Sequence, residues 1–138
     1  NKDANLLINP PYNLTNDLLD KNVKLRIKGN KQDLIKDLKS SRIMLVPGHK
    51  GEVFCLAAEE ARELCIPIVT LGYGSLYERV EHNVTGFVAK NLKEFTYYAH
   101  KLLNDDDLYL KFRENLFKLR NTRNYSHVAN DLLKIISN

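Results

Sequence analysis

The sequence predicts an α/β fold with a doubly wound parallel sheet. Short apolar runs typical of strands alternate with longer segments in which apolar residues recur at helical spacing. The clearest unit is the apolar run Ile43–Val46, a helical segment at about residues 53–64, and a second apolar run, Pro67–Val69, inside an expected strand at residues 66–70. Strands that alternate with helices form parallel sheets through right-handed crossovers. The 138 residues, of which 43% are hydrophobic and 28% charged, suit one globular domain.

Before this unit, the sequence predicts two strands and two helices. Residues 4–8 form an apolar run that two prolines end, and a short helix at residues 16–20 is expected to follow with Thr15 as its cap. Residues 23–27 alternate apolar and polar side chains, which indicates a strand with one wetter face. After a turn at Gly29-Asn30, a helix is expected that presents one apolar face, at Leu34, Ile35 and Leu38.

After the second apolar run, the chain is mostly helical. A glycine-bearing loop at residues 72–75 leads to a helical turn at 76–80 and a strand at 86–89. Asp105 and Asp106 suit the start of a helix, and Ser126 is expected to cap the last one. The expected helices cover residues 92–103, 106–120 and 126–136.

The charge is mildly basic, with 21 Lys and Arg against 17 Asp and Glu, and a pI near 9.0. Such an excess favours anionic ligands or an acidic membrane surface. The aromatic-and-basic strand pattern of an RNA-binding sheet is missing, so nucleic acid is not an expected partner. No segment is long and apolar enough to cross a membrane, and the polar start is not that of a signal peptide.

The two cysteines are expected to be small buried residues of a reducing compartment. Cys55 and Cys65 fall in the same expected helix, where ten residues span roughly 15 Å. That separation is too long for a disulfide.

Two carboxylates, Glu52 and Glu60, are the main candidates for function. Glu52 follows the strand that ends at Val46, and Glu60 lies eight residues further on, inside the expected helix. In open α/β sheets, ligands bind at the carboxyl ends of the strands. Acids beside a helix N-terminus at that edge indicate a ligand with both hydroxyl and phosphate groups.

Several motifs in this order resemble the donor-binding, C-terminal half of retaining glycosyltransferases of family GT4, which have the GT-B fold and a Rossmann-like domain. The resemblance covers about residues 22–136, and its motifs are Glu52-x7-Glu60 with Phe54 and Leu56, Ile66-Pro67-Ile68-Val69, Gly74-x3-Glu78, Asn83-x-Thr85-Gly86-Phe87-Val88, and Tyr125-Ser126-His127.

Some positions depart from the family pattern. Cys55 and Cys65 both stand where the family usually has glycine, so the backbone at Cys55 is expected to approach the donor less closely. The family's Arg and Lys, which neutralise the donor diphosphate, have no counterpart here. Residues 1–138 are therefore expected to be a single nucleotide-sugar-binding domain, a fragment without the N-terminal acceptor domain and the upstream Arg/Lys segment.

The resemblance implies a role for each candidate residue. Glu60 is expected to bind the ribose hydroxyls of a nucleoside-diphosphate sugar, and Glu52 to be the catalytic-site carboxylate that faces the donor sugar. Because unpaired amides at a helix start suit phosphate, the N–H groups of Phe54, Cys55 and Leu56 are expected to bind the diphosphate. The nucleobase is expected at Gly29, Asn30 and the region of Lys31, and Lys50, with His49, could assist the phosphates.

The implied reaction is transfer of a sugar from this donor to a glycan or lipid-linked acceptor, with retained configuration. The expected setting is bacterial lipopolysaccharide, capsule or another cell-surface polysaccharide. The enzyme would be a hexosyltransferase, and the isolated domain is expected to be inactive. No cofactor and no metal are expected. The expected location is the cytoplasm, with peripheral contact of the full-length protein with the inner membrane as an option.

Other interpretations stay open at this point. Glu52 could be an acid that only stabilises the start of a helix, Glu60 a solvated helix residue, and Glu59 is interpreted as a surface residue. The chain could also be a non-catalytic nucleotide-sugar-binding module, or part of a nucleotide-sugar epimerase with GT-B architecture.

Overall fold

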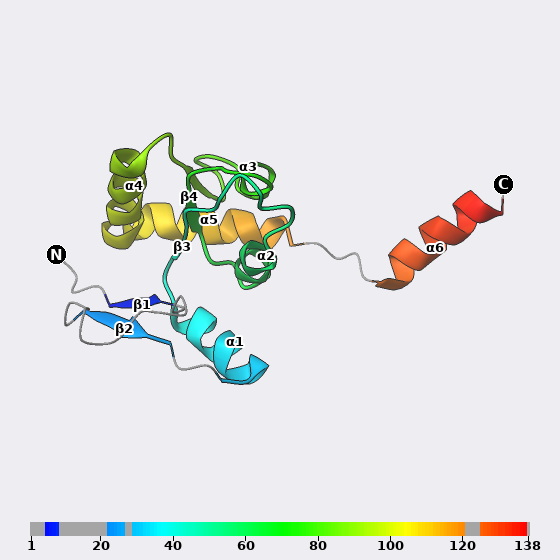
Figure 1. Cartoon of the computed structure of the whole chain (residues 1–138), viewed down its shortest axis with the longest axis horizontal. Coiled ribbons are helices and arrows are strands. Elements are labelled where there is room, and N and C mark those ends of the chain that lie inside the picture. Colours follow the sequence, from blue (N-terminus) through cyan, green and yellow to red (C-terminus); the bar gives the residue numbers. More distant parts are fainter. Residues whose placement is uncertain (1–4, 9–21, 27–28, 121–124, 138) are drawn as a thin grey trace.

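The structure is a computed structural model of the chain, and it describes residues 5–8, 22–26, 29–120 and 125–137. The described strands form two parallel sheets (Figure 1). Strands β1 (Leu6–Ile8) and β2 (Val23–Leu25) pair with each other. The other sheet has the order β3-β4-β5, with β3 at Met44–Val46, β4 at Ile68–Thr70 and β5 at Gly86–Val88. The predicted parallel α/β fold is confirmed, although the described strands make two sheets rather than one.

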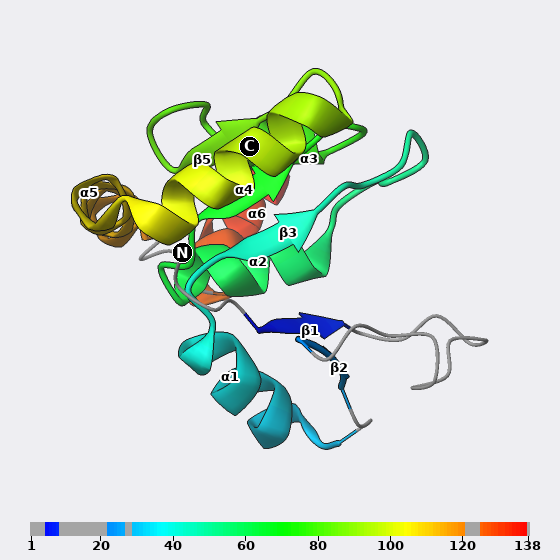
Figure 2. The ribbon, with the colours of Figure 1, turned by 90° about the vertical axis from the view of Figure 1, so that its left-hand side faces the viewer.

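Helices cover both faces of the three-stranded sheet. Helix α2 (Leu56–Glu63) and the short helix α3 (Leu76–Arg79) pack on one face. Helices α4 (Leu92–Asn104) and α5 (Asp106–Lys118) pack on the other. Figure 2 shows α2 and α4 on opposite sides of β3. The domain is therefore doubly wound around this sheet.

The alternation of side chains along β4 explains the two layers. Ile68 belongs to the core that α2 and α3 complete, whereas Val69 belongs to the core on the side of α4 and α5. Successive strand residues point to opposite faces, so a strand with a helical layer on each face must be apolar throughout. Both residues and the neighbouring Thr70 are at most 3% exposed. The centre of the second core is Phe112 of α5, which is completely buried.

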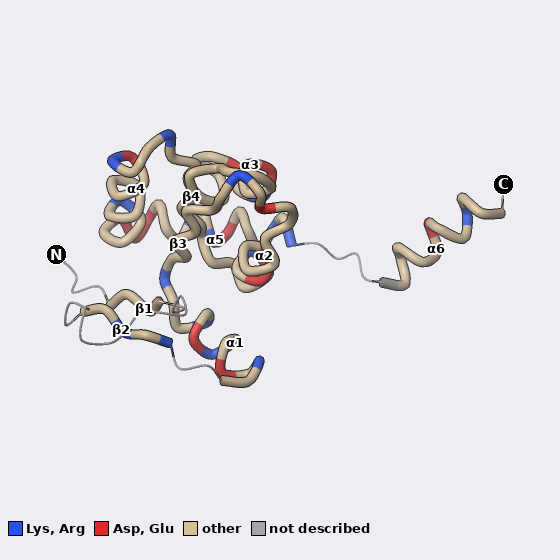
Figure 3. Tube along the Cα trace, viewed as in Figure 1, with Lys and Arg blue, Asp and Glu red and all other residues tan. Residues whose placement is uncertain are grey.

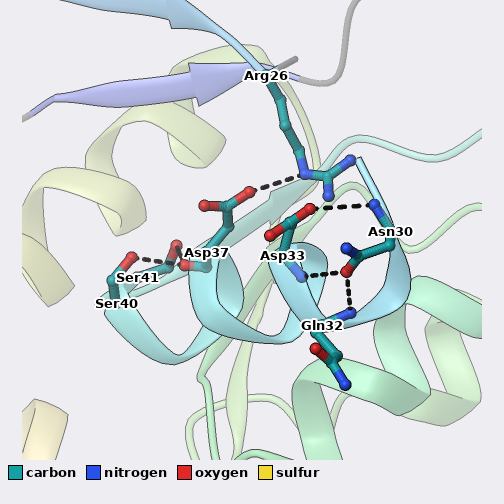
Figure 4. Close-up of polar contacts among 7 residues, drawn as sticks. All are labelled: Arg26, Asn30, Gln32, Asp33, Asp37, Ser40 and Ser41. Atoms are coloured by element: carbon teal, nitrogen blue, oxygen red, sulfur yellow. Dashed lines mark hydrogen bonds and ion pairs between the residues drawn. The ribbon is translucent and has the colours of Figure 1, made fainter. Parts of the chain in front are cut away.

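Helix α1 (Lys31–Ser40) precedes β3 and is tied to β2. Asn30 caps it, since its side-chain oxygen accepts hydrogen bonds from Gln32 N–H and Asp33 N–H, while the Asp33 carboxylate accepts from Asn30 N–H. This reciprocal arrangement is a capping box. On the same helix, the Asp37 carboxylate lies 2.9 Å from Nε of Arg26, just beyond β2 (Figure 4). The two contacts fix where α1 begins and how it lies against the small sheet.

Most element positions agree with the prediction, and the differences have local causes. Helix α2 begins at Leu56 rather than near Val53, because Cys55 has a left-handed backbone with φ +53°. Asp105 caps α5 by accepting from Leu108 N–H, as its sequence position indicated. The expected cap Ser126 is wrong, because α6 (Tyr125–Ile136) already includes it. The helix expected at residues 16–20 and its cap Thr15 lie outside the described residues.

Helix α6 lies apart from the other described elements (Figure 1). Its apolar side chains are exposed, from 46% at Val128 to 78% at Ile136. No helix among the described residues is long and apolar enough to cross a membrane. Acidic and basic positions alternate along α1 and α4, whereas α2 carries three glutamates and one arginine (Figure 3).

Candidate functional site

The carboxyl ends of β3, β4 and β5 lie at one edge of the sheet, because the three strands are parallel. Two loops leave this edge and meet. The first, residues 47–55, joins β3 to α2 and carries Glu52, and the second, residues 71–75, joins β4 to α3. The prediction that Glu52 follows a strand at the carboxyl edge is therefore confirmed. This is the edge at which open α/β sheets bind ligands.

The backbone of Glu52 is held between the two loops. Its N–H donates to His49 carbonyl at 3.0 Å, and its carbonyl accepts from Ser75 N–H at 2.9 Å. Gly74 lies directly against this carbonyl, with φ +59°. A Cβ on Gly74 would lie 2.3 Å from the Glu52 carbonyl oxygen, so glycine is required here by contact as well as by backbone conformation.

The Glu52 carboxylate is half-buried and has two partners. Its Oε1 accepts from Cys55 N–H at 3.0 Å, and its Oε2 lies 3.7 Å from His49 Nε2. The expectation that the Cys55 amide is unpaired is therefore wrong, since Glu52 itself is the acceptor. Among the described residues, the N–H groups of Phe54 and Leu56 have no acceptor, so two of the three expected amides remain for a ligand.

The two cysteines lie on either side of α2, and the prediction that both are inside it is wrong. Cys55 precedes the helix and Cys65 follows it, with φ values of +53° and +56°. Both are buried and unpaired, as expected. Their backbone conformation favours glycine, which is the residue that the resemblance places at both positions. The family's glycines at these two positions therefore already indicated a left-handed backbone at Cys55 and Cys65.

Glu60 lies on a different surface, in a groove between α1 and α2. The groove has a volume of about 470 Å³. The Glu60 side chain is exposed, and its carboxylate has no hydrogen-bond or ion-pair partner in the described part of the chain. The groove combines apolar side chains with charged ones of both signs, and it is lined by Lys31, Leu34, Ile35, Leu38, Lys39, Leu56, Glu59, Glu60, Glu63 and Leu64.

The structure brings some of the predicted residues together and leaves others apart. Glu60 and Leu56 share the groove with Lys31, and Asn30 lies directly before Lys31 at the start of α1. The Asn30 side chain is used for capping, as shown in Figure 4. Gly29 packs close to Asp33, where an added Cβ would lie 2.5 Å from Oδ2.

At the Glu52 loop, Phe54 is 48% exposed, and Lys50 lies exposed two residues before Glu52.

The sequence analysis missed a cluster of charges behind Phe54. Glu59 was interpreted as a surface residue, which is wrong, because its side chain is only 21% exposed and contacts two arginines. Arg79 Nη1 lies 2.9 Å from Glu59 Oε1, and Arg62 Nη2 lies 3.6 Å from Oε2. The Arg79 guanidinium also lies over the Phe54 ring, 4.1 Å from its centroid. The i, i+3 spacing of Glu59 and Arg62 indicates their ion pair from the sequence alone. The contact of Glu59 with Arg79 joins residues twenty positions apart, and no sequence pattern indicates it.

The pKa of the exposed Glu114 on α5 is lowered, because Lys118 donates a hydrogen bond to its carboxylate and supplies a positive charge beside it. Within the described residues, no group of three or more His, Cys, Asp or Glu side chains is placed to hold a metal ion. The chemistry of the site is therefore argued from its carboxylates, amides and basic side chains.

The comparison with protein families decides the assignment. The family model of glycosyl transferases group 1 matches residues 13–119 of the chain. The chain belongs to the group 1 glycosyl transferases. A search of curated proteins found no match.

As a member of this glycosyl transferase family, the chain is part of the machinery for sugar transfer, which requires a nucleotide-sugar donor and an acceptor. The matched residues include the whole loop of Glu52 and the whole groove of Glu60, whereas α6 follows the match. Both candidate carboxylates therefore lie in the segment that defines the family.

Proposed function

We propose that this chain is the donor-binding domain of a retaining glycosyltransferase that uses a nucleoside-diphosphate sugar. The observation that supports it best is the Glu60 carboxylate in the groove between α1 and α2, which has no partner among the described residues. Glu60 lies in α2, and Glu52 lies in the loop before this helix, at the sheet edge. The two carboxylates flank the start of α2. This arrangement suits a ligand with hydroxyl groups at both ends and a diphosphate between them.

The nucleoside is assigned to the groove. Its apolar side chains can cover a base, and an ionised carboxylate accepts two hydrogen bonds from the cis hydroxyls of a ribose. Glu60 is the acidic residue of the groove to which this role is assigned, because it is the one the motif singles out and it is not engaged by another described side chain. Gly29, Asn30 and Lys31, at the start of α1, are assigned to the edge of the base.

The diphosphate and the sugar are assigned to the loop before α2. The N–H of Leu56 opens that helix and the N–H of Phe54 lies two residues before it, and the helix dipole adds a favourable term for an anion there. Lys50 supplies a mobile cation from the same loop. Glu52 then faces the sugar. Catalysis of this kind depends on holding the reacting groups in place and on stabilising the leaving diphosphate.

The wider setting is inferred from the resemblance to the GT4 pattern. We infer a cytoplasmic hexosyltransferase for a glycan or lipid-linked acceptor of a bacterial cell surface, with the acceptor bound by a second, N-terminal domain. No metal or cofactor has a role in this mechanism. The second candidate function is a non-catalytic nucleotide-sugar-binding module, which the Glu60 carboxylate, unengaged among the described residues, also supports. Both functions require nucleotide binding at Glu60.

The test is calorimetric titration of UDP, GDP and ADP into this chain and into two variants. Glu60→Gln removes the acceptor charge assigned to the ribose, and Glu63→Gln removes the same charge one helical turn further along the groove. Removing a carboxylate strengthens the binding of a diphosphate through Coulomb forces. We expect Glu60→Gln to weaken binding about tenfold or more nonetheless, because a charge-assisted hydrogen bond is worth about 1.5–3 kcal/mol.

Glu63→Gln is expected to leave the affinity unchanged or slightly raised. Equal effects of the two variants would contradict the ribose assignment. If none of the three nucleotides binds the unmodified chain, the proposed function of the chain is wrong. Transfer assays with the full-length protein, which supplies the acceptor domain, then separate an active transferase from a binding module.

A further inference from the structure

Phe54 lies in the candidate site, and its ring is held from behind by Arg79. The residue follows Glu52 by two positions, and its ring is half-exposed. The Arg79 guanidinium lies 4.1 Å from the ring centroid, within the range of a cation–π contact. Arg79 comes from the end of α3, on the far side of the loop. One face of the loop is therefore packed against a cation.

The guanidinium is itself fixed by Glu59. The distance from Nη1 to Glu59 Oε1 is 2.9 Å, and the two side chains are 23% and 21% exposed. Arg79 Nε is buried, and it has no hydrogen-bond acceptor among the described residues. The Glu59 carboxylate and the Phe54 ring are therefore the partners that the structure gives this guanidinium. An arginine with a planar fork and a stacked face orients its partner more rigidly than a lysine does.

The same part of the chain holds the backbone of Glu52. Ser75, which directly precedes α3, donates its N–H to the Glu52 carbonyl, and Gly74 packs against that carbonyl. The residue after Phe54, Cys55, donates its N–H to the Glu52 carboxylate. A movement of Phe54 is thus transmitted through one peptide unit to the hydrogen bond that orients the Glu52 side chain.

We propose that Arg79, anchored by Glu59, is a positioning residue that sets the orientation of the Glu52 carboxylate through Phe54. The inference deepens the proposed function and rests on it where the donor sugar is concerned. It assigns a role to the contact between Glu59 of α2 and Arg79 of α3, neither of which is one of the two motif carboxylates.

The first test needs no ligand and follows amide hydrogen exchange by NMR. Arg79→Gln removes the cation from the ring, whereas Arg62→Gln removes the other arginine from Glu59 and leaves the ring contact in place. Each variant loses one positive charge and one partner of the same carboxylate. We expect Arg79→Gln to speed exchange at Cys55 N–H about two- to fivefold relative to the amides of α4, which matches the worth of an exposed cation–π contact. Arg62→Gln is expected to leave this ratio unchanged.

Equal exchange rates in the two variants would overturn the positioning role, as would acceleration of all amides alike in Arg79→Gln. The latter result would mean that Arg79 contributes only to global stability. A Phe54→Leu background supplies a further check, because the effect of Arg79→Gln at Cys55 N–H is expected to disappear when the ring is gone.

The second test compares UDP, GDP and ADP with the glucose conjugate of whichever one binds. Only the conjugate reaches Glu52, so Arg79→Gln is expected to weaken its binding about two- to fivefold more than that of the free nucleotide, whose diphosphate meets only the loop amides. Arg79→Lys, which retains a cation, is expected to recover part of the loss. Equal weakening of both ligands would overturn the assignment to Glu52. Failure of every nucleotide to bind the unmodified chain would instead refute the proposed function, and the exchange experiment would still decide whether Arg79 orients Glu52.

Discussion

The close packing of Gly74 on the Glu52 carbonyl leads to a prediction with a clear magnitude. Gly74 has φ +59°, and a Cβ there would lie 2.3 Å from the carbonyl oxygen and 3.0 Å from Glu52 Cβ. The left-handed conformation costs a non-glycine residue about 1–2 kcal/mol. A methyl group forced into a filled space costs about 1–3 kcal/mol more. Gly74→Ala is therefore expected to lower the free energy of unfolding by about 2–5 kcal/mol.

Gly51 provides a matched control in the neighbouring loop. It is not among the glycines with positive φ, and an added Cβ would meet its nearest described atom, His49 Nδ1, at 3.4 Å. Gly51→Ala is expected to leave the free energy of unfolding unchanged or to raise it by up to about 1 kcal/mol, since alanine has less freedom than glycine in the unfolded chain.

The measurement is urea unfolding of both variants and the unmodified chain, followed by far-UV circular dichroism. A lower midpoint with an unchanged m-value identifies a change in stability rather than in the unfolded state. If Gly74→Ala is as stable as Gly51→Ala, the two loops do not meet at the Glu52 carbonyl as described. The reasoning that places Glu52 by this contact would then be refuted.

Three further predictions are checked by the same urea measurements. Phe112→Ala removes a completely buried ring and is expected to cost about 3–5 kcal/mol, whereas Phe117→Ala, at a position 65% exposed on the same helix, should cost little. Similar losses would mean that α5 does not face the core as described. Asn30→Ala removes the cap of α1 and is expected to cost about 1 kcal/mol, while Gln32→Ala, which keeps the cap, should be near neutral. Cys65→Val is expected to be less stable than Cys65→Ala, against the order of hydrophobicity, because a β-branched side chain strains a residue at φ +56°; the opposite order would contradict that backbone conformation.

The parts of the fold that the sequence predicted depend on local signals. The run of residues 66–69 is apolar at every position, so it could be identified as a strand between two helical layers without knowledge of its neighbours. Helix α5 shows the same logic, with Phe112 and Leu116 at helical spacing and both buried. The start of α2 was placed too early because the left-handed Cys55 ends the loop there. A cysteine does not by itself indicate a left-handed backbone.

The candidate site was predictable to the same degree. The position of Glu52 after a strand is a matter of chain order, and its place at the sheet edge follows from the parallel topology. The Arg79 contact with Glu59 and Phe54 joins residues that are 20 and 25 positions apart, so only the folded chain brings them together. The groove between α1 and α2 could not be predicted either, because it depends on how two helices with amphipathic faces are spaced.

The two motif carboxylates differ in a way that fits their different proposed tasks. Glu60 is exposed and unengaged among the described residues, so it can take hydroxyl groups without giving up a bond within the protein. Glu52 is already oriented, because its Oε1 accepts from Cys55 N–H and its backbone is held by Ser75. Its Oε2, 3.7 Å from His49 Nε2, is the oxygen with more room for a ligand. A carboxylate held in one orientation discriminates between positions of a sugar hydroxyl, since turning it toward a misplaced hydroxyl would break the bond to Cys55. Binding strength is thus assigned to the groove, and geometric selection to the loop at the sheet edge.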